Sequence, residues 1–191
     1  MKLVQEVERF EELQVFFGEE LRDEFVTELA RHVIGDSFKR FTLRKAFNIT
    51  SPAFSLFFSK PLPSLLHLNL DECILLTDDV LVDISVACPY LESFTATWCP
   101  QLRYLGVKCL VGRCLRLRKL NMTGTKKLTD EAFLEFIPKQ DGGKVGESAF
   151  RVMKKLNLES CDYVGDELLL KIKRCYPHIK IYNYFKEEVE L

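Results

Sequence analysis

A pattern of leucines and small residues recurs about every 26 residues, and this period constrains the fold more than any other feature. Its clearest copy runs from Leu65 to Asp79 and has the form L-x-x-L-x-L-x-x-C-x-x-L-T-D-D. The middle leucine position serves as an anchor, filled in turn by Leu13, Phe41, Leu68, Phe94, Leu120, Leu156 and Tyr182. Successive anchors are separated by 26 to 28 residues, except for one interval of 36. Periods of this size indicate a solenoid of stacked repeats.

The chemistry of each position predicts a strand, a tight turn and a helix in every repeat. Alternating apolar residues such as Leu68 and Leu70 place one face of a short strand against a core. Small residues follow, where a turn packs its side chain inside: Gly18, Ala46, Cys73, Cys99, Thr125 and Cys161. The Thr-Asp-Asp that begins at Thr77 favours a helix start. Residues 80–87 then have helical spacing, and Pro89 ends the helix.

With these residues the chain resembles the cysteine-containing class of leucine-rich repeats. The resemblance is carried by the core L-N-L-x-x-C-x-x-L-T-D at 68–78, by its near copy at 156–166, and by the Cys-Pro-x-Leu joint at 88–91. It implies an α/β fold, a right-handed solenoid or horseshoe with parallel strands on the concave face and helices on the convex face. We expect a single domain over 1–191, with about six to seven repeats and a loop insertion at 139–148.

The resemblance also implies a function. This class of repeats is typical of F-box substrate receptors of ubiquitin ligases and of the antagonist-of-mitotic-exit-network family. Because the repeat pattern already begins at Phe10, the type without an F-box is the nearer likeness. The implied role is a non-catalytic adaptor or scaffold that binds proteins in a ubiquitin-ligase or cell-cycle setting. Two alternatives are a structural subunit of a large multiprotein assembly and a nucleic-acid binder that uses a basic patch.

Composition and residue spacing argue against several other classes. The 27 basic and 28 acidic residues give a net charge of −1, so no global excess favours nucleic acid. Seven cysteines without a Cys-x-x-Cys pair favour buried free thiols. The three histidines lie in separate repeats. We therefore predict no catalytic residue, metal, cofactor or small-molecule substrate. The start resembles neither a secretory signal nor a transit peptide, and no apolar run could span a bilayer, which favours the cytoplasm or nucleus.

The candidate site consists of residues in and just after the strands whose side chains are expected to point away from the core and not to pack in it. We predict that partners bind at Arg40, Arg44, Lys45, His67, Asp71, Glu72, Trp98, Lys119 and Lys155. The only tryptophan, Trp98, either anchors an interface or packs under a neighbouring loop. An outward column that includes Asn69, Asn121 and Asn157 is expected to form an asparagine ladder along the sheet. The same register turns Ile181 outward beside Lys155.

Other segments leave alternatives open. The basic run from Arg113 to Leu120 is expected to be a solvated face, with Leu115, Leu117 and Leu120 turned inward. The insertion at 139–148 is either a tolerated surface loop or a partner-contacting loop. The charged C-terminal tail is expected to cap the solenoid. The first repeat carries Phe16 and Phe17, and few residues precede it to cover its apolar end. We therefore predict an end-on contact there with another protein or segment.

Overall fold

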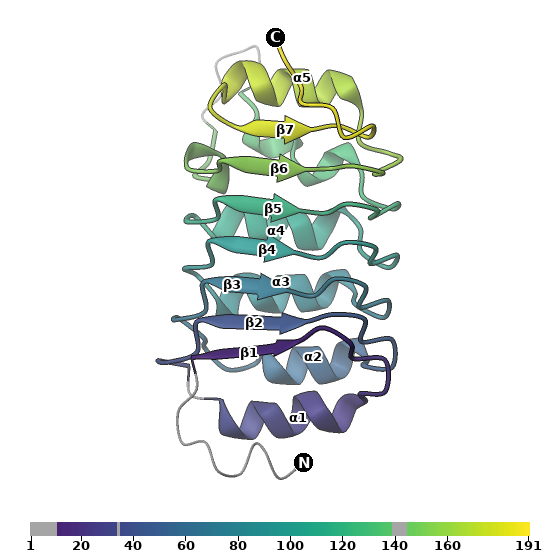
Figure 1. Ribbon diagram of the computed structural model, residues 1–191. Coiled ribbons are helices and arrows are strands. Elements are labelled where there is room, and N and C mark those ends of the chain that lie inside the picture. The colour runs from purple at the N-terminus through teal and green to yellow at the C-terminus, as the bar shows by residue number, and fades with distance from the viewer. Residues whose placement is uncertain (1–10, 34, 139–144) are drawn as a thin grey trace.

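The computed structural model describes residues 11–33, 35–138 and 145–191. Seven parallel strands form one open sheet in which each strand lies beside its sequence neighbours, and the helices lie on one side of that sheet (Figure 1). The strands are β1 (Glu12–Val15), β2 (Arg40–Leu43), β3 (His67–Asn69), β4 (Ser93–Thr95), β5 (Lys119–Asn121), β6 (Lys155–Asn157) and β7 (Lys180–Tyr182). The helices are α1 (Asp23–His32), α2 (Ser51–Phe57), α3 (Asp78–Ala87), α4 (Tyr104–Arg113) and α5 (Asp166–Cys175). Strand, turn and helix therefore alternate as the repeats predict.

Strand pairing confirms the first six anchors and corrects the seventh. The confirmed anchors are direct partners in neighbouring strands: Leu13, Phe41, Leu68, Phe94, Leu120 and Leu156. In β7 the partner of Leu156 is Ile181, and Tyr182 pairs with Asn157 instead. A shift of one residue exchanges the two faces of a strand. The shifted register buries the fully apolar Ile179 and Ile181, both 0% exposed, so Ile181 faces the core and the prediction that it faces outward is wrong.

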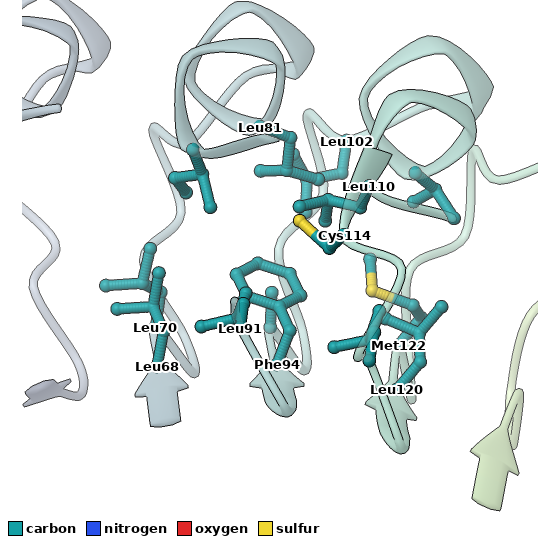
Figure 2. Close-up of a cluster of buried hydrophobic side chains, with 14 of the residues drawn as sticks. Leu68, Leu70, Leu81, Leu91, Phe94, Leu102, Leu110, Cys114, Leu120 and Met122 are labelled. Atoms are coloured by element: carbon teal, nitrogen blue, oxygen red, sulfur yellow. The ribbon is translucent and has the colours of Figure 1, made fainter. Parts of the chain in front are cut away.

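One apolar core lies between the sheet and the helices. Figure 2 shows its middle, where Leu68, Phe94 and Leu120 of successive strands face Leu81 of α3 and Leu110 of α4. These five side chains are at most 2% exposed. Burying a side chain of this size stabilises a fold by about 1.5–3 kcal/mol. Because the contacts run between repeats, each repeat depends on its neighbours for stability.

The column of small residues is buried and links each repeat to the one before it. The Cys99 thiol donates a hydrogen bond to the backbone oxygen of Leu70 (3.3 Å), and the Cys161 thiol donates to that of Met122 (3.2 Å). The hydroxyl of Thr125 makes the equivalent contact. Only a small side chain that is apolar or carries a donor fits here, which is why cysteine recurs.

Helix starts are capped across the boundary between repeats. Asp78, the first residue of α3, accepts hydrogen bonds from the backbone N–H groups of Arg103 (2.7 Å) and Leu105 (3.0 Å) at the start of α4. Asp23 and Asp130 make similar bonds with the chain at the starts of α2 and α5. The pattern predicts the starts of α3 and α5 correctly, but each cap serves the next repeat, and the threonine before α3 makes no side-chain cap.

The repeat after β5 departs from the predicted pattern. Its Thr-Asp-Glu predicts a helix start, but among the described residues the short 3₁₀ segments η2 (Asp130–Ala132), η3 (Leu134–Phe136) and η4 (Ala149–Arg151) occupy the helix's place. Ile137 is extended because it precedes Pro138, which disfavours helical backbone at that position. The rings of Phe133 and Phe136 lie 6.0 and 6.1 Å from that of Phe150 and fill the space where a helix would pack.

The C-terminal tail folds back along the outer edge of β7. Tyr182 and Glu188 form an antiparallel bridge, and the N–H of Val189 donates to the oxygen of Ile181 at 2.8 Å. Val189 also packs against the core. This arrangement agrees with the cap expected at that end.

At the other end of the sheet, Phe16 and Phe17 are 47% and 76% exposed. Residues 1–10, which include Phe10, and residues 139–144 of the predicted insertion at 139–148 lie outside the described part of the chain. The helices that are described are all too short or too polar to cross a membrane.

Candidate functional site

The face of the sheet opposite the helices, here called the open face, has no helix over it among the described residues (Figure 1). At its centre a short side chain lies between two long ones, because the register places Ser93 of β4 between His67 of β3 and Lys119 of β5. Three hollows of about 300, 280 and 160 Å³ each have Ser93 and Lys119 in their walls. Together they extend from Arg40 on β2 to Lys155 on β6.

Five basic side chains gather on the C-terminal half of the open face, over β5, β6 and β7. Lys119, Lys155 and Lys180 are direct partners in neighbouring strands, and Arg118 and Lys154 each precede one of them. All five are exposed. We call these five residues the basic ladder. Strands lie about 4.8 Å apart, so the like charges are close together.

The basic ladder differs from the basic residues nearer the N-terminus, which have acidic partners. Lys39 lies 2.9 Å from a carboxylate oxygen of Glu11, and Arg40 lies 3.5 Å from one of Glu12. Within the described part of the chain, no ladder residue forms an ion pair; Lys155 instead places its ammonium 4.8 Å from the centre of the Tyr182 ring. The ladder is therefore a patch of positive charge without a direct ion pair, with Glu92 in the wall of the adjoining hollow.

His67 lies where these two groups meet. Its pKa is lowered, chiefly because partial burial disfavours the charged imidazole, and then because Arg40 and Lys119 add positive charge nearby. Glu92 and Glu12 oppose this effect. Of the ladder, only Lys119 acts on His67, and together with burial and Arg40 it favours the neutral imidazole there.

A row of tight turns follows the strands along one rim of the sheet. In each turn one residue has left-handed backbone, with φ between 54° and 72°: Lys45, Glu72, Trp98, Gly124, Ser160 and Lys186. The side-chain oxygens of Asn69, Asn121 and Asn157 accept hydrogen bonds from the N–H two residues later, at 2.9 to 3.1 Å. These oxygens shape the turns of their own repeats and do not form the expected ladder.

Two of the predicted binding residues help to build this rim. Asp71 is 7% exposed and accepts a hydrogen bond from the N–H of Thr97 in the next repeat at 2.9 Å. Arg44 places Nε 3.4 Å from the other carboxylate oxygen of Asp71. A nearly buried carboxylate with these partners joins three repeats, so its role here is structural.

Trp98 packs against the next repeat, close to one of the two alternatives left open by the sequence, while its role as an interface anchor stays a prediction. Its side chain is 49% exposed, yet its ring packs over Gly124 in the next repeat. A Cβ at Gly124 would lie 2.4 Å from the ring, and Gly124 also has left-handed backbone. The other turns hold residues with side chains in the same backbone conformation, so it is the Trp98 ring that requires glycine here, and about half of the Trp98 side chain remains available to solvent.

The predicted site residues fall into two groups that the structure keeps apart. Arg40, His67, Lys119 and Lys155 line the hollows of the open face, whereas Arg44, Lys45, Asp71, Glu72 and Trp98 belong to the turn rim. The sequence reasoning missed Arg118, Lys154 and Lys180. Lys180 could have been found by aligning the alternating apolar Ile179 and Ile181 with the core positions of the preceding repeat.

The basic run at 113–120 is divided among several environments. Leu117 and Leu120 are buried as predicted, but Leu115 is 38% exposed, so its inward placement is wrong. The Arg113 guanidinium donates to the Ser85 hydroxyl at 3.3 Å, and Arg116 lies over the Tyr90 ring. Only Arg118 and Lys119 of this run contribute to the open face. Across the described ranges, no group of three His, Cys, Asp or Glu is placed to hold a metal ion.

Comparisons with known proteins show which fold this chain shares. The sequence matches no family model, and no curated protein is similar to it. Among solved structures, a chain of the crystal structure of the Rad7 and Elc1 complex in yeast matches 88% of this chain with a TM-score of 0.69 and 16% identity. The match takes in 38% of that chain, so this protein spans well under half of its structural neighbour. With seven parallel strands and their helices, the likeness identifies an α/β, leucine-rich-repeat-like solenoid.

Proposed function

We propose that this protein is a non-catalytic module that binds another protein on the open face of its sheet. One observation carries the proposal: three hollows meet at Ser93 and Lys119, on a face over which the described part of the chain places no helix. Solenoids commonly use such an extended sheet face for binding. The structural neighbour comes from a complex of two proteins, which supports a protein partner here. An adaptor role in a ubiquitin-ligase or cell-cycle setting remains a prediction from the resemblance.

A second candidate, the structural subunit of a larger assembly, rests on the exposed Phe16 and Phe17 at the β1 end of the sheet. Their exposure supports an end-on contact with another protein. This contact and the open-face site use different surfaces, so variants can separate them.

The test blocks the centre of the open face without changing charge. Ser93→Tyr fills the hollows, and Val86→Tyr adds the same ring on α3, where Val86 is 66% exposed. Each variant is used to capture partners from cell extract, and a captured protein is then purified and titrated by calorimetry. Substitutions on the turn rim are less suitable for this test. Arg44→Glu, for example, would leave the nearly buried Asp71 beside a second carboxylate.

We expect one partner to bind the wild type and Val86→Tyr with equal affinity and to lose at least tenfold with Ser93→Tyr. A partner that binds Ser93→Tyr normally would contradict the open-face site. If that partner were lost with Phe17→Ser, the end-on alternative would take its place.

A further inference from the structure

We infer that the basic ladder recognises an acidic segment of the partner protein, a short extended stretch rich in Asp and Glu. This inference rests on the proposed function and adds the chemical class of the partner. It concerns Arg118, Lys119, Lys154, Lys155 and Lys180, only two of which were expected from the sequence.

Repulsion among the residues of the basic ladder opposes the stability of the sheet that carries them. Lys155 lies directly between Lys119 and Lys180 in the register, and like charges opposite one another destabilise a sheet. The same column in β1 and β2 instead pairs Glu12 with Arg40. Three adjacent lysines are therefore not what packing or pairing within the sheet favours, and an anionic ligand would offset their repulsion.

The positive charge of the basic ladder is local to one part of the protein. The whole chain has a net charge of −1, so the protein is not a general polycation. Some basic residues elsewhere in the described chain form ion pairs, as Lys108 does with Glu135 (2.6 Å) and Lys171 with Glu167 (2.8 Å), and others, such as Arg113 and Arg116, lie against neutral groups. The ladder differs from both because its five basic residues are neighbours on one face, and complementary potential is what steers and orients a partner.

The shape of the open face beside the basic ladder also suits an acidic peptide. Two hollows of about 280 and 160 Å³ lie beside the ladder, over the short Ser93 and Thr95 of β4. The larger is lined by Arg118, Lys119 and Lys154 on one side and by His67 and Glu92 on the other, so a carboxylate that enters it would meet three cations and one like charge. Three or four residues of an extended peptide, at about 3.3 Å each, cover the length of the ladder.

The same features favour a peptide over a nucleic acid. The ladder extends over only three strands, about 10 Å. Neither hollow has a Phe, Tyr or Trp ring in its wall, and the one ring there is the imidazole of His67, whereas binding of single-stranded nucleic acid relies on several rings that stack with successive bases. The ring of Tyr182 lies under the Lys155 ammonium.

The test measures binding of a fluorescein-labelled decamer of alternating Glu and Ser by anisotropy at fixed ionic strength. A decamer of alternating Lys and Ser and a ten-nucleotide single-stranded DNA serve as comparison probes. The test variant is Lys119→Glu/Lys155→Glu. The control, Lys171→Glu/Arg174→Glu, makes the same change in net charge on α5, away from the open face. A third variant, Lys119→Gln/Lys155→Gln, removes the two charges without adding acidic ones.

We expect the acidic peptide to bind the wild type. Its dissociation constant should rise at least tenfold in the Glu variant, less steeply in the Gln variant, and less than twofold in the control. The thermal midpoint of Lys155→Glu should not fall, because the change relieves repulsion within the column. An equal loss in the control, or no binding of the acidic peptide, would overturn the inference. Tighter binding of DNA than of peptide, lost in the same variant, would overturn it in favour of a nucleic acid.

These outcomes are separable from those of the proposed function. If Ser93→Tyr loses a protein partner while the Glu variant retains it, the open face binds proteins but the ladder does not define their chemistry. If neither variant affects the partner, the proposed open-face site fails as well.

Discussion

At the scale of single residues, the turn rim shows how a tryptophan and a glycine in different repeats determine each other. Trp98 has left-handed backbone, which costs a residue with a side chain about 1–2 kcal/mol. Its ring then covers Gly124, where no Cβ could fit. Sequence inspection identifies Trp98 as unusual, but the glycine that accommodates it is recognisable only once the repeats are stacked.

This pairing predicts a non-additive effect on stability. Gly124→Ala should lower the free energy of unfolding by about 2–4 kcal/mol, because the new methyl group meets the Trp98 ring and the backbone stays left-handed. In a Trp98→Ala background the same change should cost only about 1–2 kcal/mol, since the clash is gone. Urea unfolding of the four proteins measures the difference, and equal costs in both backgrounds would contradict the contact.

At the scale of elements, the starts of the helices depend on the preceding repeat. Asp78 accepts two hydrogen bonds from the start of α4, while its neighbour Asp79 is exposed. Gly106 of α4 makes this approach possible, because a Cβ there would lie 2.6 Å from the Cβ of Leu81 on α3. The two helices are therefore joined at their N-terminal ends as well as through the core.

We predict that Asp78→Ala lowers the free energy of unfolding by about 1–2 kcal/mol, the usual effect of losing a helix cap. Asp79→Ala is the matched control, because it removes the same charge from the first turn of α3 without touching α4. Hydrogen exchange should show faster exchange of the Leu105 amide in Asp78→Ala alone. Equal exchange in the two variants would argue that the cap contributes nothing.

The sequence predicts these elements well wherever the repeat length is constant. The first six anchors and the column of small residues follow from periodicity alone, because each position must face the same core. Periodicity fails at Tyr182, where one residue fewer separates the anchors and burial of Ile181 decides the register. It also fails after β5, where Pro138 ends the helical region and aromatic rings take the helix's place.

The candidate site was less predictable for a related reason. His67 and Lys119 could be assigned to the open face from their spacing alone. The shift in β7 hid Lys180 from that spacing, so the ladder was incomplete. The structural role of Asp71 depends on a backbone N–H of the next repeat, a contact between residues far apart in the sequence, and no spacing rule identifies it.

At the scale of the whole molecule, the buried thiols tie stability to pH. All seven cysteines are free, and five of them are buried: Cys73, Cys88, Cys99, Cys114 and Cys161. Burial raises the pKa of Cys99, Cys114 and Cys161 to about 12, and raises those of Cys73 and Cys88 as well. In the unfolded chain thiols ionise near pH 8.5, so above this pH the unfolded state loses protons that the folded state keeps.

We therefore predict that the free energy of unfolding falls as the pH rises from about 9 toward 12. Each buried thiol contributes up to about 1.4 kcal/mol per pH unit in this window and nothing below it. Urea unfolding at pH 7, 9 and 10 measures the slope. Cys99→Ala/Cys161→Ala should make the slope shallower, while Cys175→Ala, at an exposed position, should not. An unchanged slope in the double variant would show that these thiols do not drive the effect.

The tail that returns along β7 has a consequence for fibre formation. Parallel strands could in principle be added from molecule to molecule, the last strand of one pairing with the first strand of the next. Here the bridge between Tyr182 and Glu188 occupies the edge such a fibre would need. Propagation would first require the tail to detach, so a few residues at one end oppose the polymerisation of a sheet whose strands all run parallel.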